Sequence, residues 1–212
     1  MILPPSFYLS EDVVGISKQL LGKKLVTSFD GFTTSGLIVE TEAYRAPDDK
    51  ACHAYGNRLT NRTKTMFMAG GTLYVYISYG IHRMINVVTA EKGKAHAILI
   101  RAIEPLVGMD KMVERRRHQI LSFDTLNGPG KSARALGVET VHDGLSLYAK
   151  ESGIWIEDIR KHISQDEIIS GPRVGMSKHT GKDAHRPWRF YIRDNQWVSR
   201  PKVAKYPNIP TK

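Results

Sequence analysis

The chain has 212 residues, 41% of them hydrophobic, which suits one globular domain. It contains no apolar run near the roughly 20 residues that cross a bilayer, and its single cysteine, Cys52, excludes an internal disulfide. Its 31 lysines and arginines outnumber 21 acidic residues, and this formal charge of +10 suits a polyanion such as nucleic acid, although a basic enzyme without such a partner fits equally well.

The hydrophobic periodicity predicts an α+β pattern, because helices and strands do not alternate regularly. In chain order we expect a helix at 7–21 with Ser10 as N-cap, strands at 23–29, 35–44, 72–79, 84–88 and 97–103, helices at 106–119 and from Ser132 to Leu136, and strands at 145–149, 153–157 and 188–193. We expect one domain over 1–212, with a loosely ordered tail after Val198 where Pro and Lys are frequent.

Two of the predicted strands combine carboxylates with aromatic rings. On one face of the first lie Ile38, Glu40, Glu42 and Tyr44, and on one face of the second lie Tyr74, Tyr76 and Ser78, opposite Leu73, Val75 and Ile77. A carboxylate among aromatic rings can act as a general base while the rings stack on a planar ligand. This combination, an acidic site in a basic protein, suggests chemistry on a nucleobase.

A glycine-rich segment, Gly128-Pro129-Gly130-Lys131-Ser132, is not a nucleotide-binding phosphate loop, because Thr125 stands where that motif needs its first glycine. A glycine-rich helix start still presents free N–H groups, so together with Lys131 it either binds one DNA phosphate or is an ordinary helix start.

The adjacent Cys52 and His53 do not have zinc-ligand spacing, and we expect no metal and no cofactor. His53 is either a stacking or hydrogen-bonding residue or a surface histidine. Tyr79, just before Gly80, is either a wedge that enters the DNA stack or a packed aromatic. Asn86 lies in an apolar strand, where a buried amide must find partners.

Arg101 follows an apolar strand in the same way as Asn86, and with Glu42 these residues suggest a polar site floored by strands. Taken together, the residues resemble the alkyladenine DNA glycosylase family, also called 3-methyladenine or methylpurine DNA glycosylases, of the mammalian type. The resemblance covers roughly 7–199. Its motifs are Val39-Glu40-Thr41-Glu42-Ala43-Tyr44, Met66-Phe67-Met68, Gly71-Thr72-Leu73-Tyr74-Val75-Tyr76, Tyr79-Gly80 with Asn86, Arg101-Ala102-Ile103-Glu104-Pro105, Gly128-Pro129, Arg173-Val174-Gly175 and Pro187-Trp188-Arg189-Phe190-Tyr191.

The resemblance implies a single α+β domain with a curved, mainly antiparallel sheet flanked by helices. It also implies a catalytic set in which Glu42 is the general base that activates water, while Arg101 and the main-chain carbonyl of Val174 hold that water.

The resemblance further implies a pocket for a flipped base. Tyr44 and His53 form one wall and Tyr76 the opposite wall, Asn86 disfavours a purine with a 2-amino group, and Tyr79 fills the gap left in the duplex. Arg62 and Lys131 fall at positions that contact phosphates.

The expected activity is that of a monofunctional DNA-3-methyladenine glycosylase in base excision repair. It would flip 3-methyladenine, 7-methylguanine, hypoxanthine or ethenoadenine nucleotides out of duplex DNA and hydrolyse the N-glycosidic bond without lyase activity. The lone cysteine and the absence of a secretion signal in Met1–Pro5 favour the cytoplasm, with association to the nucleoid if the protein is bacterial. We also expect a monomer with no membrane partner. A catalytically silent nucleic-acid-binding module and an RNA-directed enzyme are the alternatives.

Overall fold

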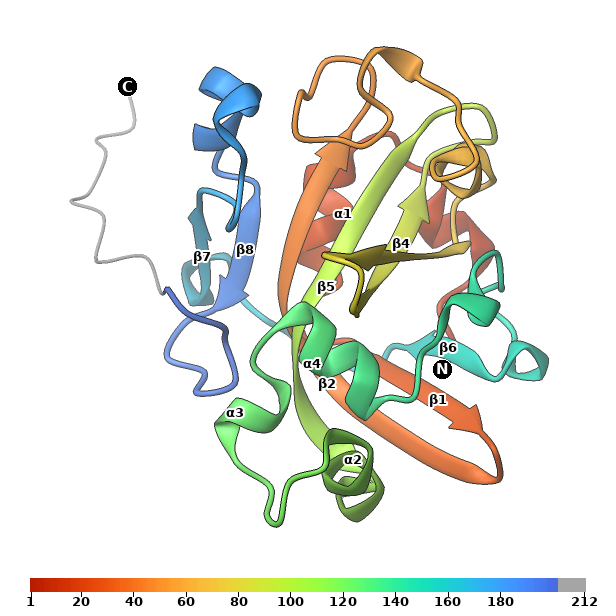
Figure 1. Cartoon of the computed structure of the whole chain (residues 1–212), viewed down its shortest axis with the longest axis vertical. Helices are drawn as coiled ribbons and strands as arrows, with labels where there is room; N and C mark the ends of the chain where they lie inside the picture. Colours follow the sequence, from red (N-terminus) through yellow and green to blue (C-terminus); the bar gives the residue numbers. More distant parts are fainter. Residues whose placement is uncertain (202–212) are drawn as a thin grey trace.

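Strands from distant parts of the chain join into one antiparallel sheet in the computed structural model, which describes residues 1–201 (Figure 1). The strands are β1 (Lys24–Phe29), β2 (Phe32–Arg45), β3 (Leu73–Ser78), β4 (His82–Thr89), β5 (His96–Val107), β6 (Ile154–Glu157), β7 (Ile168–Gly171) and β8 (Arg189–Ile192). Their order is β3-β4-β5-β2-β1-β6, and β8 pairs with both β2 and β7.

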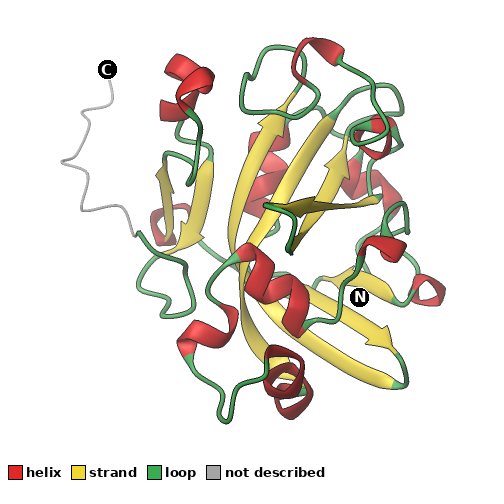
Figure 2. Ribbon diagram, in the orientation of Figure 1, coloured by secondary structure: helices red, strands yellow, loops and turns green. Residues whose placement is uncertain are grey.

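Four α-helices accompany the sheet in the described part of the chain (Figure 2). They are α1 (Val13–Gln19), α2 (Met109–Arg116), α3 (Phe123–Leu126) and α4 (Pro129–Ala135). The expected α+β class with a curved antiparallel sheet is therefore confirmed. No helix in residues 1–201 is long and apolar enough to cross a membrane.

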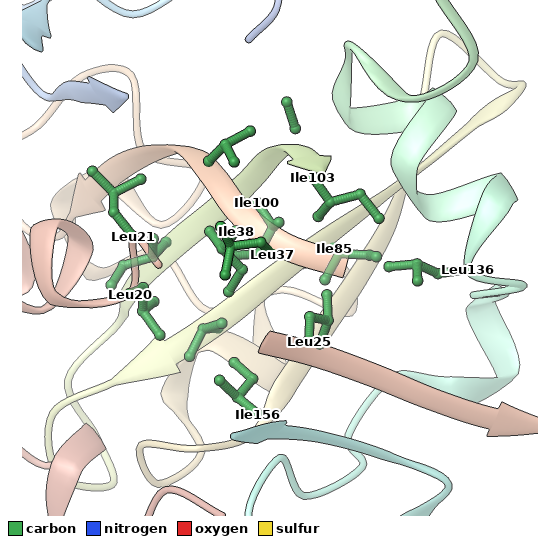
Figure 3. Packing of buried hydrophobic residues seen from close by; sticks show 14 of the residues in the cluster. Leu20, Leu21, Leu25, Leu37, Ile38, Ile85, Ile100, Ile103, Leu136 and Ile156 are labelled. Carbon is green, nitrogen blue, oxygen red and sulfur yellow. The ribbon is translucent and has the colours of Figure 1, made fainter. Parts of the chain in front are cut away.

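The core lies where α1, α2 and α4 meet the strands, and its side chains form one continuous cluster (Figure 3). Leu20 and Leu21 follow α1, Leu25 and Ile38 come from β1 and β2, and Leu136 follows α4; all five are at most 2% exposed. Burial of each such side chain contributes roughly 1.5–3 kcal/mol to folding. A second, smaller cluster of buried hydrophobic residues, which includes Met66, Tyr74 and Ala97, lies next to the residues of the site.

Several predicted boundaries were wrong for local reasons. The first helix begins at Val13 rather than 7, because the Asp12 carboxylate accepts the N–H of Gly15 at 2.9 Å and is the N-cap in place of Ser10. α4 begins three residues before Ser132, with a proline in its first turn, and α2 covers only part of 106–119 since β5 continues to Val107.

Two elements were missed and one was predicted wrongly. α3 is a single turn closed by a capping box, and β7 has four residues that alternate only weakly in burial. The segment 145–149 is not a strand; it makes one isolated bridge, between Ser146 and Thr72. Elements this short carry too few residues for a periodic signal.

β2 positions the site because both of its edges are paired. Its inner edge follows β5 along Ser35–Arg45, with bulges on either side of Glu40. Its outer edge pairs with β1 first and then, from Glu40 to Glu42, with β8. The stretch that carries the two carboxylates thus has a strand on each side, which fixes its main chain.

The start of the predicted loose tail is firmly attached. Ser199 is 2% exposed, and its N–H donates to Glu40 at 2.8 Å. The carbonyl of Pro201 accepts a bond from Arg189 at 2.6 Å. The prediction is therefore wrong for 199–201, and its remaining part, 202–212, lies outside the described residues.

Candidate active site

A cavity of about 390 Å³ opens beside β2, β3, β4 and β5, and loop residues 50–53 and 174–180 complete its lining. Its lining includes nine of the ten predicted site residues, namely Glu42, Tyr44, His53, Arg62, Tyr76, Tyr79, Asn86, Arg101 and Val174. Lys131 does not line it, although Pro129 in the same helix does. The sequence thus identified a set that the fold brings together from four strands and the loops between elements.

Glu42 lies at the inner end of this cavity, with no solvent-exposed surface. Its Oε2 accepts a bond from the Tyr44 hydroxyl at 2.6 Å, and its Oε1 accepts one from the Val174 N–H at 2.8 Å. Arg101 Nη1 lies 3.3 Å from the same Oε1. A carboxylate offers about four acceptor positions, so these three contacts leave one for a water molecule.

The hydroxyl beside this carboxylate stays protonated. Burial, followed by the negative charge of Glu42, raises the pKa of Tyr44 well above its ordinary value. Tyr44 is therefore a permanent donor to Glu42. The expected common face of Glu42 and Tyr44 is confirmed by their contact.

Arg101 is shared between two carboxylates. Its Nε donates to Glu40 Oε1 at 3.1 Å while Nη1 faces Glu42. Burial lowers the pKa of Arg101, but Glu42 and Glu40 more than offset this and hold the pKa above its ordinary value. The guanidinium is thus a fixed positive charge beside the carboxylate that would act as base.

A second buried ion pair supports the segment that contains Val174. The Arg173 guanidinium donates to both oxygens of Asp49, at 2.5 and 2.8 Å, and to the carbonyl of Ala43 at 2.8 Å. The same guanidinium lies 4.7 Å from the Tyr44 ring centre. Arg173 therefore joins β2 to the loop that brings the Val174 N–H to Glu42.

Three aromatic residues and Arg62 form one side of the cavity. His53 Nε2 accepts a bond from Arg62 at 3.0 Å, and since an arginine only donates, the ring proton is on Nδ1, 3.1 Å from the Tyr74 hydroxyl. Burial and then the charge of Arg62 lower the pKa of His53 to about 4. His53 is accordingly a neutral residue at physiological pH.

The expected arrangement of the pocket walls was wrong in one respect. The rings of His53 and Tyr76 meet edge to face, with centroids 4.6 Å apart. A base between them would need a separation of about 7 Å, two contacts of roughly 3.5 Å each. His53 therefore belongs to the same wall as Tyr76, and Tyr44 is the separate aromatic residue near Glu42.

Asn86 is held by the main chain. Its amide nitrogen donates to the carbonyls of Tyr74 at 3.1 Å and Met84 at 3.2 Å, and the side chain is 3% exposed. Both amide hydrogens already donate to the main chain, so the amide nitrogen points no N–H group at a donor on a ligand and cannot repel it in that way. Discrimination by Asn86 would therefore act through its shape and position.

Tyr79 occupies the tip of the hairpin between β3 and β4, and its side chain is 87% exposed. This excludes the packed interpretation. Its φ of +50° is unusual for a residue with a side chain and costs on the order of 1–3 kcal/mol. An exposed aromatic in a strained turn contributes little to stability, which favours a role in contacting a ligand.

Some of the basic side chains have structural contacts. Lys131 is half-buried in α4, where its Nζ donates to Asn127 at 2.9 Å. Arg189, which lies in the basic stretch near the C-terminus, is 1% exposed and donates to Glu40 at 2.6 Å. Arg189 is therefore excluded from contact with a polyanion. Among residues 1–201 no group of three His, Cys, Asp or Glu side chains could hold a metal ion.

The chain also matches known proteins over most of its length. The family model of methylpurine-DNA glycosylase matches residues 6–196. The chain belongs to the methylpurine-DNA glycosylase family.

Relatives agree with this assignment. A provisionally named 3-methyladenine DNA glycosylase of Bacillus cereus is 43% identical over 206 residues, which cover 94% of this chain and 100% of that protein. A provisionally named 3-methyladenine DNA glycosylase of Chlamydia felis is 45% identical over 196 residues, covering 90% and 96%. These relatives are bacterial, so they support the family, and the mammalian type stays a prediction.

Sequence reasoning missed some residues that build the glycosylase-family site. Glu40 was placed correctly on the face of Glu42, but nothing indicated that it binds two arginines. Asp49 carried no such signal, and its partner Arg173 lies 124 positions away. A buried-looking carboxylate in a strand was the available signal, because such a group requires a cationic partner.

Proposed function

We propose that this chain is a monofunctional DNA glycosylase that flips damaged purine nucleotides out of duplex DNA and hydrolyses their N-glycosidic bond. The observation that carries the proposal is a buried carboxylate, Glu42, at the inner end of an aromatic-walled cavity, held by three contacts and with one acceptor position left. This arrangement suits a general base next to a bound nucleobase.

In the reaction, Glu42 accepts a proton from a water molecule whose oxygen attacks the sugar C1′. The bond between C1′ and the purine nitrogen breaks, and its electron pair leaves with the base. Arg101 and Val174 orient the carboxylate and the water. His53 is neutral at physiological pH and both of its ring nitrogens already have protein partners, so its proposed task is to hold the base by packing.

The proposed substrates are purines whose pairing or glycosidic bond is already weakened. They are 3-methyladenine, 7-methylguanine, hypoxanthine and ethenoadenine. Flipping costs a few kcal/mol, while each aromatic stack returns roughly 1–3 kcal/mol, so damaged and poorly paired bases are favoured. Tyr44 and Tyr76 would provide the stacking, and Tyr79 would occupy the space left in the duplex.

A catalytically silent nucleic-acid-binding module is the weaker interpretation. A carboxylate that faces a polyanion lowers the affinity for it. Here Tyr44, Arg101 and the Val174 N–H all contact and orient the Glu42 carboxylate, which a protein that only binds nucleic acid would not need. The cavity does not distinguish DNA from RNA, so a matched RNA duplex belongs in the same experiment.

The test is incubation of the purified protein with duplexes that each carry one defined lesion. We expect release of the free purine and an abasic site, so that the strand breaks only after alkali treatment. Lys50 is the one lysine among the cavity-lining residues of the described chain, so borohydride trapping should accompany the assay. Breaks without alkali together with a trapped adduct would show lyase activity. If the protein released none of the four bases, the proposal would be contradicted.

A further inference from the structure

Glu40 is a buried carboxylate that the proposed mechanism does not use. It lies two residues before Glu42 on β2, has no exposed surface and is not among the residues that line the cavity. Its Oε1 accepts bonds from Arg101 Nε at 3.1 Å, Arg189 Nε at 2.6 Å and Ser199 Oγ at 2.9 Å. Its Oε2 accepts the Ser199 N–H at 2.8 Å. Four donors on one carboxylate make a fixed anchor.

The anchor determines how Arg101 faces the cavity. Arg101 Nε is bound to Glu40, and Nη2 donates to Ser199 Oγ at 3.2 Å. A guanidinium is planar and rigid, so fixing two of its nitrogens also fixes the third. The third, Nη1, is the atom that lies 3.3 Å from Glu42.

The anchor also balances charge. Glu40 and Glu42 face Arg101 and Arg189 in a region with almost no exposed surface, so two negative and two positive charges compensate one another. Arg189 is itself held by the carbonyls of Ser199 and Pro201, at 2.9 and 2.6 Å. Without the charge of Glu40, Glu42 would be the only carboxylate left beside two guanidinium groups.

We propose that Glu40, with Arg189 and Ser199, is a positioning residue that holds Arg101 so that only Nη1 reaches Glu42, which leaves Glu42 free to accept a proton from water. This inference rests on the proposed glycosylase function. Released from Glu40, Arg101 would turn two nitrogens toward Glu42 and cover the acceptor position that the water needs. Chemistry would then slow while base binding, which occurs in the cavity, would not change.

The test is single-turnover excision by Glu40→Gln, measured with damaged-duplex affinity and across pH. We expect the maximal rate to fall about 10- to 100-fold, as for a catalytic group misplaced by roughly 1 Å, with affinity changed less than about twofold. Ser199→Ala keeps every charge and removes one contact each to Glu40 and Arg101, so we expect a smaller fall of about 3- to 10-fold.

The pH profile separates positioning from mere loss of stability. Glu42 is faced by Tyr44 from β2, by Arg101 from β5 and by the segment of Arg173 and Val174. In Glu40→Gln, two guanidinium nitrogens of Arg101 would place more positive charge beside the reacting carboxylate, so the acid limb of the rate should move to lower pH. A variant that is only less stable would unfold at a higher pH than wild type during acidification, so the acid limb of its rate profile would move to higher pH.

Glu157→Gln is the matched control, because it removes a part-buried carboxylate of β6 that binds Lys24 and Trp155, none of which lines the cavity. It should lower stability and leave the rate unchanged. An unaltered rate and pH profile in folded Glu40→Gln, or equal losses in rate and affinity, would overturn the inference. An inactive wild-type protein would instead refute the proposed function, so the two failures are distinguishable.

Discussion

Replacing Tyr44 with phenylalanine removes one oxygen atom from the site and keeps the aromatic ring. The lost bond, from the Tyr44 hydroxyl to Glu42 Oε2, is 2.6 Å long and charge-assisted, a type that contributes roughly 1.5–3 kcal/mol. Loss of this whole amount in the transition state would slow excision about 10- to 150-fold. Because Glu42 gives up negative charge as it accepts a proton, this bond is weaker in the transition state than before it, so the expected decrease of about 10-fold comes from the lost orientation of Glu42.

Single-turnover excision of hypoxanthine from a defined duplex measures this decrease. Tyr74→Phe is the matched control, since its hydroxyl contacts His53 Nδ1 at 3.1 Å and not the carboxylate. We expect Tyr74→Phe to weaken base binding more than the maximal rate. A Tyr44→Phe rate within twofold of wild type, or losses of the same kind in both variants, would refute the orientation of Glu42 by Tyr44.

Four further predictions concern the cavity and its rim. Tyr79→Ala should reduce base flipping, reported by a fluorescent base at the target position, and should change the free energy of unfolding by less than about 0.5 kcal/mol because the side chain is 87% exposed. Lys131→Ala and Arg62→Ala should each lower the log-log salt slope of binding by at most about 0.9 if these residues contact a phosphate, since both already have a protein partner, Asn127 and His53. Asn86→Ser should raise release of 7-methylguanine relative to hypoxanthine, and an unchanged ratio would leave Asn86 as a purely structural link. Because the His53 pKa is about 4 in the folded chain, the unfolded chain binds a proton below pH 6.5 that the folded chain does not bind. The free energy of unfolding should therefore fall by up to about 3 kcal/mol between pH 6.5 and pH 4. His53→Asn should make this fall shallower.

Contacts within one strand could be predicted from the sequence. Side chains alternate along a strand with a period of two, so Glu42 and Tyr44 had to share a face, and Tyr74 and Tyr76 had to do the same. The structure joins the first pair by a hydrogen bond and the second by ring contact, at 5.4 Å between centroids. The resemblance to the family then supplied most of the remaining site residues.

Contacts between strands could not be predicted in the same way. The pairing of β2 with β5 slips at bulges beside Glu40, and this slip brings Arg101 between Glu40 and Glu42. No residue in the sequence signals such a slip, because a bulge inserts one position without a distinctive side chain. The wall formed by His53 was misassigned for a related reason, since its loop conformation depends on Arg62 and Tyr74.

The central claim is that Glu42 activates the water that releases the base. Excision by Glu42→Gln, measured beside damaged-duplex affinity, tests it most directly, because the amide keeps the size of the carboxylate and removes its basicity. We expect the single-turnover rate to fall by at least about 10²–10⁴-fold while affinity stays close to that of wild type. Excision by Glu42→Gln at a near-normal rate would contradict the account.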